Sequence, residues 1–286
     1  MSDTPETTDT TASDTHEPSS ASPLAEVADH IRQGHPEAAL AGLKERIRNE
    51  PGNADLRLSL AQLEAIAGNW EKAMAAADTA STLDTSRGLL CQQWKLQIAA
   101  EQTRVEVFAG ERTAIVMGDP EPWIAGMQDA LRMDGEGQAE AADAARRAAL
   151  EQAPARTGTI DGTPFEWLCD ADERLGPVFE AIINGRYMWV PQSAVTSVKV
   201  QPPSELIDLV WVESVFRFTN GGETAGLMPV RYPGSTSSDD PKVVLGRLTA
   251  FESTAAGTNI GLGQRLLATD ADDYPLLQVG TIAFND

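Results

Sequence analysis

The sequence predicts a multidomain α and α+β protein, in which an N-terminal helical-repeat solenoid precedes an α+β domain with a mostly antiparallel sheet. Two observations carry this prediction. In the first half, apolar residues recur at helical spacing and with a repeat of about 34 residues. After about Arg156, glycine, proline and aromatic residues become more frequent and β-branched runs appear. We therefore expect an acidic tail over residues 1–23, a helical repeat domain over 24–156 and an α+β domain over 157–286.

The first 22 residues are mostly Thr, Ser, Asp, Glu and Pro, and the initiator Met is their only large apolar residue. Such a segment cannot bury enough apolar surface to offset the entropy lost on ordering. We therefore expect the acidic tail to be disordered.

Helical periodicity begins at Leu24. The first expected helix ends near Gly34, and the second runs from Pro36 to just before Pro51. The third covers about residues 53–67, and the fourth begins at Asn69. Later helices are expected around residues 94–108, 123–133 and 137–154.

The first four helices repeat with a fixed period. Gly34 and Gly68 hold equivalent positions one period apart, and so do Ala39 and Ala73. A helix–turn–helix period of about 34 residues is the tetratricopeptide spacing, so we expect a tetratricopeptide-like α-solenoid. Two or three imperfect repeats cannot bury their end face alone, and the C-terminal region is the expected cap.

The α+β domain is expected to contain several strands and two short helices. The strands are expected over residues 165–169, 186–190, 195–200, 209–212, 215–219, 226–230 and 276–282, and the helices over 175–184 and 242–251. Asn220-Gly221-Gly222 is a strong hairpin signal between two of these strands.

The composition excludes several classes of function. The chain has 43 acidic and 22 basic residues and a net charge of −21, which argues against binding to nucleic acid or to an anionic membrane surface. The two cysteines, Cys91 and Cys169, fit a reduced, cytoplasmic setting. All three histidines lie within the first 35 residues, so no later site can use a histidine base or ligand. We expect no cofactor and no bound metal.

The segment Asp161–Glu173 is the most unusual stretch, because it concentrates carboxylates. One interpretation is a metal-dependent enzyme that uses these carboxylates. The other is turn and capping chemistry, in which Asp161-Gly162 forms a turn and Asp170 and Asp172 cap the next helix. Gly261–Arg265 resembles a fragment of a phosphate-binding loop but lacks the full glycine pattern and the Lys-Ser/Thr end.

A partner-binding groove is expected on the well-fitting repeat. The first-helix positions that usually face such a groove are Asp55, Leu58, Gln62, Ala65 and Ile66. Their mixture of apolar and polar side chains suits an amphipathic partner helix. These residues could equally pack on the preceding repeat. A second candidate surface comprises Trp167, Asp170, Asp172 and Arg174.

Five segments, in order, resemble the ImpE/TagJ family of type VI secretion accessory proteins. They are GNWEKAMAAAD, VFAGERTAIVMGDPEPWI, GTIDGTPFEWLCDADERLGPVFEAIINGRYMWVP, DLVWVESVFRFTNGGETAGLMPVRYPGS and GLGQRLLATDADDYPLL. The resemblance as a whole spans roughly residues 30–280, and the five segments lie between residues 68 and 277.

The resemblance implies a non-enzymatic adaptor. It implies binding to a helical segment of the small contractile-sheath subunit, and through the sheath an indirect link to the ATPase that recycles it. It assigns no catalytic residue. The alternatives from other classes are the carboxylate-based enzyme and a repeat protein that captures C-terminal carboxylates, which needs a basic groove that these positions do not supply.

Overall fold

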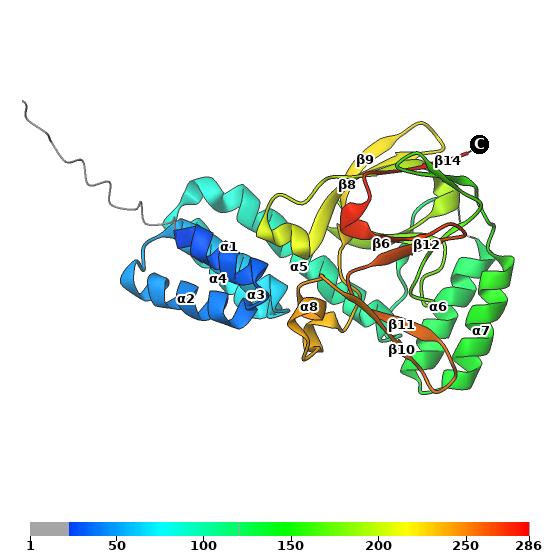
Figure 1. Ribbon diagram of the computed structural model, residues 1–286, viewed down its shortest axis with the longest axis horizontal. Helices are drawn as coiled ribbons and strands as arrows, with labels where there is room; N and C mark the ends of the chain where they lie inside the picture. Colours follow the sequence, from blue (N-terminus) through cyan, green and yellow to red (C-terminus); the bar gives the residue numbers. More distant parts are fainter. Residues whose placement is uncertain (1–22, 120, 286) are drawn as a thin grey trace, which may run out of the picture.

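The structure is a computed structural model that describes residues 23–119 and 121–285. The predicted acidic tail (residues 1–23) lies outside the described residues, apart from Pro23, at which helix α1 begins. Helices form the first half of the chain and a mostly antiparallel sheet forms the second half (Figure 1). This order confirms the coarse prediction. The helices of the first half are α1 (Pro23–Arg32), α2 (Pro36–Asn49), α3 (Ala54–Ile66), α4 (Trp70–Leu83), α5 (Gly88–Phe108), α6 (Pro122–Gly135) and α7 (Ala139–Gln152).

The predicted repeat period is visible in the helix bounds. Helix α4 (Trp70–Leu83) begins and ends one period after α2 (Pro36–Asn49), and α5 begins one period after α3. Ala39 and Ala73, at equivalent positions of α2 and α4, are both fully buried, as close packing of neighbouring helices requires. Gly68 ends α3 with a φ of +75°, a conformation that glycine adopts without strain.

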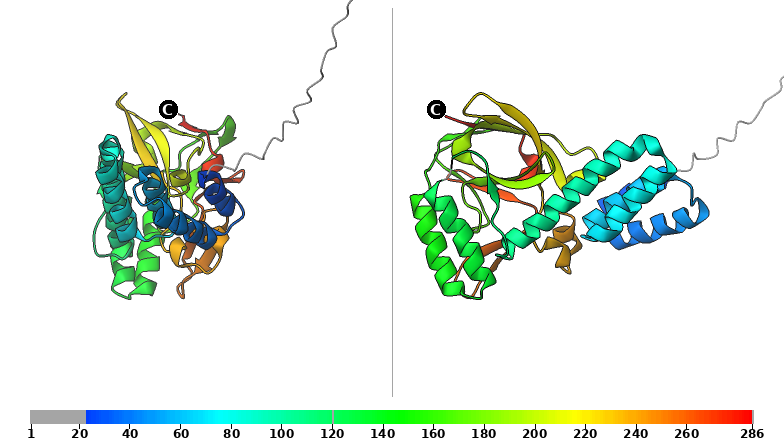
Figure 2. Two further views of the ribbon diagram at one scale, coloured as in Figure 1. Left: turned by 90° about the vertical axis from the view of Figure 1, so that its left-hand side faces the viewer. Right: turned by 180° about the vertical axis from the view of Figure 1, so that it is seen from behind.

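Helix α5 joins the two groups of helices in the first half of the chain. It has 21 residues and crosses from the α1–α4 group to the α6–α7 pair, passing beside the sheet (Figure 2). A short 3₁₀ turn, Thr85–Arg87, precedes it, and the Asp84 side chain caps that turn by accepting a hydrogen bond from the Ser86 amide at 2.9 Å.

The largest sheet of the described residues has nine strands in the order β1-β6-β5-β9-β8-β7-β14-β2-β3. Their bounds are β1 (Ile115–Val116), β2 (Gly158–Ile160), β3 (Thr163–Phe165), β5 (Val178–Ile183), β6 (Arg186–Pro191), β7 (Val195–Val200), β8 (Trp211–Phe218), β9 (Glu223–Pro229) and β14 (Thr281–Phe284). Strand β1 comes from the predicted helical domain and pairs with β6 in parallel, whereas the other pairs are antiparallel.

Two smaller sheets and one short helix complete the C-terminal half. One sheet pairs β10 (Thr249–Ser253) with β11 (Asn259–Gly263); the other has the order β13-β12-β4, with β4 (Leu168–Asp170), β12 (Leu266–Thr269) and β13 (Asp273–Pro275). Helix α8 (Pro241–Val244) is short, and a 3₁₀ turn, η3 (Leu206–Leu209), packs against α3.

Two helix predictions for the C-terminal half are wrong. Residues 175–184 contain strand β5, all six residues of which are buried. A continuous apolar run without alternation does not distinguish a buried strand from a helix, and Asn184-Gly185 is the β5–β6 turn. The helix expected over 242–251 ends at Val244, because Gly246 turns the chain with a φ of +62° towards β10.

Four expected strands also differ in extent. The strand expected over 165–169 is divided between β3 and β4, and the two expected over 209–212 and 215–219 form the single strand β8. Residues 276–282 divide into a 3₁₀ turn, Leu276–Gln278, and the start of β14. The hairpin predicted at Asn220-Gly221-Gly222 joins β8 to β9.

One buried apolar cluster runs through both halves. It includes Ile66 of α3, Ile124 of α6, Val178 of β5, Trp189 of β6 and Trp211 of β8. The helical half is therefore not packed as a separate body, since the C-terminal half covers one side of it.

Polar and aromatic contacts reinforce this union. The Trp70 and Trp211 rings stack with their centroids 5.8 Å apart. Arg231 donates to the carbonyl of Ile66, at the end of α3, at 2.6 Å. Arg247 donates to the carbonyl of Ile31, near the end of α1, at 2.6 Å. Guanidinium groups at helix C-termini satisfy free carbonyls and complement the helix dipole.

Candidate functional site

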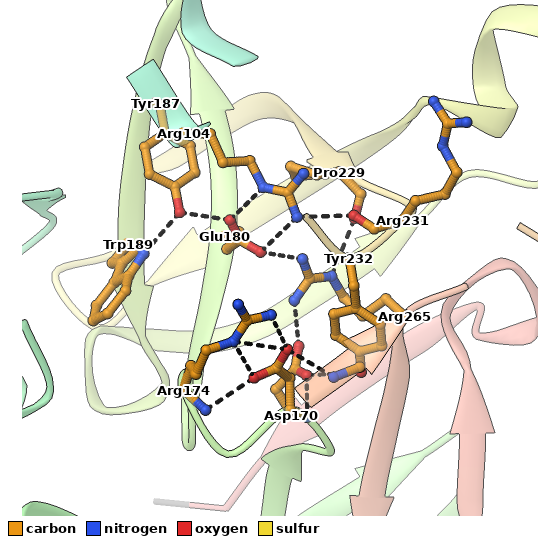
Figure 3. A network of polar contacts seen from close by, with 12 residues as sticks. Arg104, Asp170, Arg174, Glu180, Tyr187, Trp189, Pro229, Arg231, Tyr232 and Arg265 are labelled. Carbon is orange, nitrogen blue, oxygen red and sulfur yellow. Dashed lines mark hydrogen bonds and ion pairs between the residues drawn. The ribbon is translucent and has the colours of Figure 1, made fainter. Parts of the chain in front are cut away.

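Charged side chains gather in a buried cluster between α5 and the sheet (Figure 3). Its centre is Glu180 of β5, whose side chain is fully buried. Glu180 accepts hydrogen bonds from Arg104 Nε at 2.6 Å and from the Tyr187 hydroxyl at 2.5 Å, and it pairs with Arg265. Tyr187 in turn accepts from Trp189 Nε1 at 2.8 Å. The Glu180 carboxylate therefore joins α5 to β6 and to the residue before β12.

A second carboxylate extends the cluster towards β4. Asp170 pairs with Arg265 and accepts from the Tyr232 hydroxyl at 2.8 Å and from the Asp172 amide at 2.9 Å. Arg265 is only 1% exposed, so it lies between Asp170 and Glu180 without access to solvent. Paired burial of this kind is the condition under which charges are tolerated inside a protein.

Helix α5 contributes a third carboxylate. Glu101 accepts from Arg104 Nη1 at 2.7 Å and from Trp211 Nε1 at 3.1 Å. Arg104 also donates from Nη2 to the carbonyl of Arg231 at 2.8 Å. The guanidinium of Arg104 thus has partners on α5, on β5 and at the chain segment after β9, and it fixes the angle at which α5 crosses the sheet.

The two central carboxylates have opposite pKa shifts. Burial raises the pKa of Glu180, but the guanidinium groups of Arg104 and Arg265 outweigh it and lower that pKa to about 2. Burial raises the pKa of Asp170 to about 6, against the opposing effect of Arg265. Glu180 therefore stays ionised throughout the physiological range, whereas Asp170 takes up a proton on mild acidification.

The Asp170→Asn variant should change the pH dependence of stability. The pKa of Asp170 in the folded protein, about 6, lies above the ordinary value of 3.8. The folded state therefore binds a proton at a higher pH than the unfolded chain does, and this group stabilises the fold increasingly as pH falls from 7 to 5. Relative to Asp170→Asn, the wild type should gain about 1 kcal/mol in unfolding free energy over that range.

Denaturant unfolding at pH 5, 6 and 7 measures this difference. The matched control is Asp239→Asn, at an exposed aspartate. A wild-type minus Asp170→Asn difference that stays constant across the three pH values would show that Asp170 does not titrate in this range.

The carboxylates of the Asp161–Glu173 segment have separate partners. Asp161 accepts from the amides of Gly280 and Thr281 at 2.9 and 2.7 Å. Glu173 accepts from the Asn259 amide at 2.8 Å. These interactions, like those of Asp170, are capping and pairing contacts. Among the residues that the structure describes, no group of three or more His, Cys, Asp or Glu side chains is placed to hold a metal ion.

The residues of the predicted second surface differ in how far they are exposed to solvent. Trp167 is 39% exposed, whereas Asp170 and Asp172 are buried. Arg174 donates to Asp172 at 2.6 Å and lies over the Phe108 ring at 4.8 Å. The structure thus brings Asp170, Asp172 and Arg174 together at the edge of the buried cluster and leaves Trp167 as the exposed member.

The predicted groove residues of α3 are mostly covered. Leu58, Ala65 and Ile66 are buried, with exposures of 8%, 2% and 0%. Gln62 is half-buried, and Asp55 is exposed but paired with Arg87 at 2.7 Å. Leu58 lies in one buried cluster with alanines of α4 and with Cys91 and Trp94 of α5. Leu58, Ala65 and Ile66 therefore pack within the chain itself.

A solvent-accessible groove lies instead between α5 and the sheet. Its larger part, of about 500 Å³, is lined by Gln93 and Leu96 of α5, by the Asn184-Gly185 turn and by residues of β8 and β9 such as Val215 and Leu227. An adjoining depression of about 290 Å³ continues along α5 towards η3. Glu213 lines both parts.

Sequence reasoning does not identify the Glu180 cluster. The available signal is a charge within an otherwise apolar run, since Glu180 interrupts the sequence VFEAII. The sequence pattern places Arg265 only in a fragment of a phosphate-binding loop, whereas the structure uses it to pair Asp170 with Glu180.

Within residues 23–119 and 121–285, no helix has the length and apolar character that crossing a membrane requires.

Known proteins resemble this chain in both sequence and fold. The family model described as ImpE protein matches residues 162–283. The type VI secretion system accessory component TagJ of Pseudomonas aeruginosa is 41% identical over 262 residues, which cover 91% of this chain and 92% of the relative. A crystal structure of a Vibrio parahaemolyticus protein is similar, with a TM-score of 0.84 at 22% identity, over 91% of this chain and 98% of that one. At this identity the last match shows the fold alone.

Proposed function

Because this chain belongs to the ImpE family, which includes the type VI secretion accessory component TagJ, we propose that it is a cytoplasmic, non-enzymatic adaptor of a type VI secretion system. Its partner is the small subunit of the contractile sheath, which it binds through a helical segment of that subunit. The sheath then provides the indirect link to the ATPase that recycles it. The 41% identity over 91% of the chain to a type VI secretion accessory component carries this proposal.

The construction of the helical half supports a helix-binding role. We infer that α1–α4 are two tetratricopeptide-like helix pairs, since the bounds of α2 and α4 are offset by one repeat period. Helical repeats bind partner helices by laying an apolar stripe into a groove. Because Leu58, Ala65 and Ile66 are buried, the proposed binding surface on this half consists of the exposed Asp55, the half-buried Gln62 and the outer face of α5.

The arrangement of charged groups supports an interaction role over catalysis. The carboxylates of Asp170, Asp172 and Glu180 are buried, and guanidinium groups pair with each of them. Such pairs position chain segments and are not free to bind a substrate. Trp167 remains a proposed contact of a second surface, since exposed tryptophans are common anchors of protein interfaces.

Isothermal titration of the full-length chain with the purified small sheath subunit from the same gene cluster tests the adaptor function. We expect saturable one-to-one binding, with a dissociation constant on the order of 1 µM or below. A sheath subunit that lacks the helical segment is the matched control, and its binding should be lost.

The titrations with the full and the truncated sheath subunit test separate parts of the proposal. Equal binding of the truncated subunit would place the contact outside the helical segment. Absence of binding to either form, with both proteins folded by circular dichroism, would overturn the adaptor function.

A further inference from the structure

Helix α5 carries an apolar stripe that is open to solvent. Leu89 is 75% exposed and Leu96 is 44% exposed. Gln92 and Ala99, also exposed, lie between and beyond them. With 3.6 residues per turn, these four positions follow one face of the helix over about three turns. Two exposed leucines on one face of a helix form a surface suited to a partner.

The repeat shows what normally covers such a face. One period earlier in the chain, Leu89, Gln92 and Leu96 correspond to Asp55, Leu58 and Gln62 of α3. On α3 only the middle position is covered: Leu58 shares a buried cluster with Ala76 and Ala77 of α4, whereas Asp55 is exposed and Gln62 is half-buried. A partner helix that covers Gln92 of α5 would therefore lie where α4 lies on α3.

In the described part of the chain, no helix follows α5 at the position that α4 holds after α3. The segment one period after α4 (Trp70–Leu83) is 104–117, which contains the end of α5, a turn and strand β1. Instead of folding back, α5 continues to Phe108 and leads into the sheet. Among the described residues, no further helix covers the Leu89–Leu96 face.

The sheet provides a second wall along this stripe. Leu96 lies against the β5–β6 turn, so closely that a side chain added at Gly185 would stand 3.0 Å from the Leu96 Cβ. Leu96 and Gln93 then line the 500 Å³ groove together with Val215 and Leu227. The groove therefore offers apolar contacts on both walls, and the exposed Leu89 lies two helical turns before Leu96 on the same face of α5, outside the groove lining.

The charge of the groove selects its occupant. Of the described residues that line the groove and the adjoining depression, the charged ones are Glu205, Asp208 and Glu213, and none is Lys, Arg or His. In a chain with a net charge of −21, this favours a partner segment that carries Lys or Arg beside its apolar face.

We propose that the groove between α5 and the sheet binds an amphipathic α-helix of the partner, whose apolar residues at i, i+3 or i+4 and i+7 contact Leu89 and Leu96 and whose Lys or Arg residues face Glu213. The proposal rests on the proposed function, since it identifies where the sheath subunit's helical segment binds. It adds the position of the site, the helix that the partner replaces in the repeat and the charge that the partner must carry.

The test compares single-site variants of the full-length chain in titrations with the sheath subunit. Leu89→Glu and Leu96→Glu should each weaken binding by at least 30-fold, because each buries a carboxylate against the partner's apolar face. Val105→Glu is the matched control. Val105 is 52% exposed on the same helix, but the helical period places it on the opposite side of α5 from both leucines, and binding should stay within about 2-fold of wild type.

Charge reversal tests the second part of the proposal. Glu213→Lys should weaken binding about 10-fold at low salt and reduce the dependence of affinity on salt concentration. Glu252→Lys, at an exposed position of β10, carries the same charge change away from the groove and should keep the wild-type salt dependence.

The possible results show separately whether the groove is the binding site and whether the adaptor function is correct. If the sheath subunit binds the wild type and the two leucine variants equally, the groove is not the site, and the adaptor function stands.

If the subunit does not bind the wild type, an 18-residue helical peptide of Leu and Lys serves as the probe. Binding of that peptide that Leu96→Glu abolishes and Val105→Glu retains would uphold the groove chemistry, whereas equal binding or none would overturn it. If sedimentation shows a wild-type dimer that Leu96→Glu dissociates, the occupant is a second copy and the proposed partner is wrong.

Discussion

Replacing Glu180 by Gln should lower the unfolding free energy by about 3–5 kcal/mol, the largest single-residue effect that we expect in this protein. The Glu180 carboxylate is fully buried and is shared by Arg104, Arg265 and Tyr187. The neutral amide keeps the shape of the side chain but leaves two guanidinium groups without their common counter-charge in a region that water does not reach. Native proteins have only about 5–15 kcal/mol of stability in total, so this loss is severe.

Thermal and denaturant unfolding measure this effect, and the variant's melting temperature should fall by roughly 10 °C. Glu252→Gln, at an exposed strand position, makes the same chemical change and should alter stability by less than about 0.5 kcal/mol. If Glu180→Gln lost less than about 1 kcal/mol, Glu101 and Asp170 would be sufficient to neutralise Arg104 and Arg265, and Glu180 would not be the link between α5 and the sheet.

The acid dependence of the two carboxylates gives the same cluster a second signature. The folded-state pKa of Glu180, about 2, lies below the ordinary value of 4.5. Its contribution to stability is therefore present above pH 4.5 and is lost as pH falls towards 2. Asp170 acts in the opposite direction between pH 7 and 5. Through this cluster, the stability of the wild type should thus rise by about 1 kcal/mol as pH falls from 7 to 5 and should fall steeply only in strong acid.

Local periodicity is sufficient to predict the first four helices. The repeat period and the glycines at residues 34 and 68 determine the order of the first four helices, because short-range spacing decides which residues share a helix face. The same spacing cannot show which face the C-terminal half covers. Leu58, Ala65 and Ile66 are therefore expected to face a groove, although they are buried within the chain.

The C-terminal half is harder to predict because its order depends on distant pairings. Strand β5 has no alternation, since all six of its residues are buried, and only its pairing with β6 and β9 distinguishes it from a helix. Glu180 lies 76 residues from Arg104 and 85 from Arg265 along the chain. Without a fold, a single glutamate in an apolar run gives no indication of partners so far away.

Among the arginines that donate to the end of a helix, Arg231 should contribute most to holding the two halves together. The Arg231 guanidinium is buried and donates to backbone carbonyls. Arg231 is 5% exposed and donates to the carbonyls of Ala65 and Ile66 at the end of α3, and to that of Val244 at the end of α8. Burial lowers the pKa of Arg231 to about 10, so it remains protonated at neutral pH. Arg231→Met keeps the apolar stem but leaves these carbonyls without a donor, and we expect a loss of about 3 kcal/mol.

Hydrogen exchange shows which part of the protein loses stability in Arg231→Met. In Arg231→Met, amides near the end of α3 should exchange much faster, whereas those of the central strands β7 and β8 should change little, because the helical half can open before the sheet unfolds. Arg247→Met is the graded control. Arg247 caps α1 through Ile31 and Arg32 in the same way but is itself exposed, so its loss should cost only about 1 kcal/mol. If both variants raised exchange equally in the helices and in the sheet, the two halves would unfold as one cooperative unit, and the shared apolar core, with Trp70 stacked on Trp211, would hold them together without these caps.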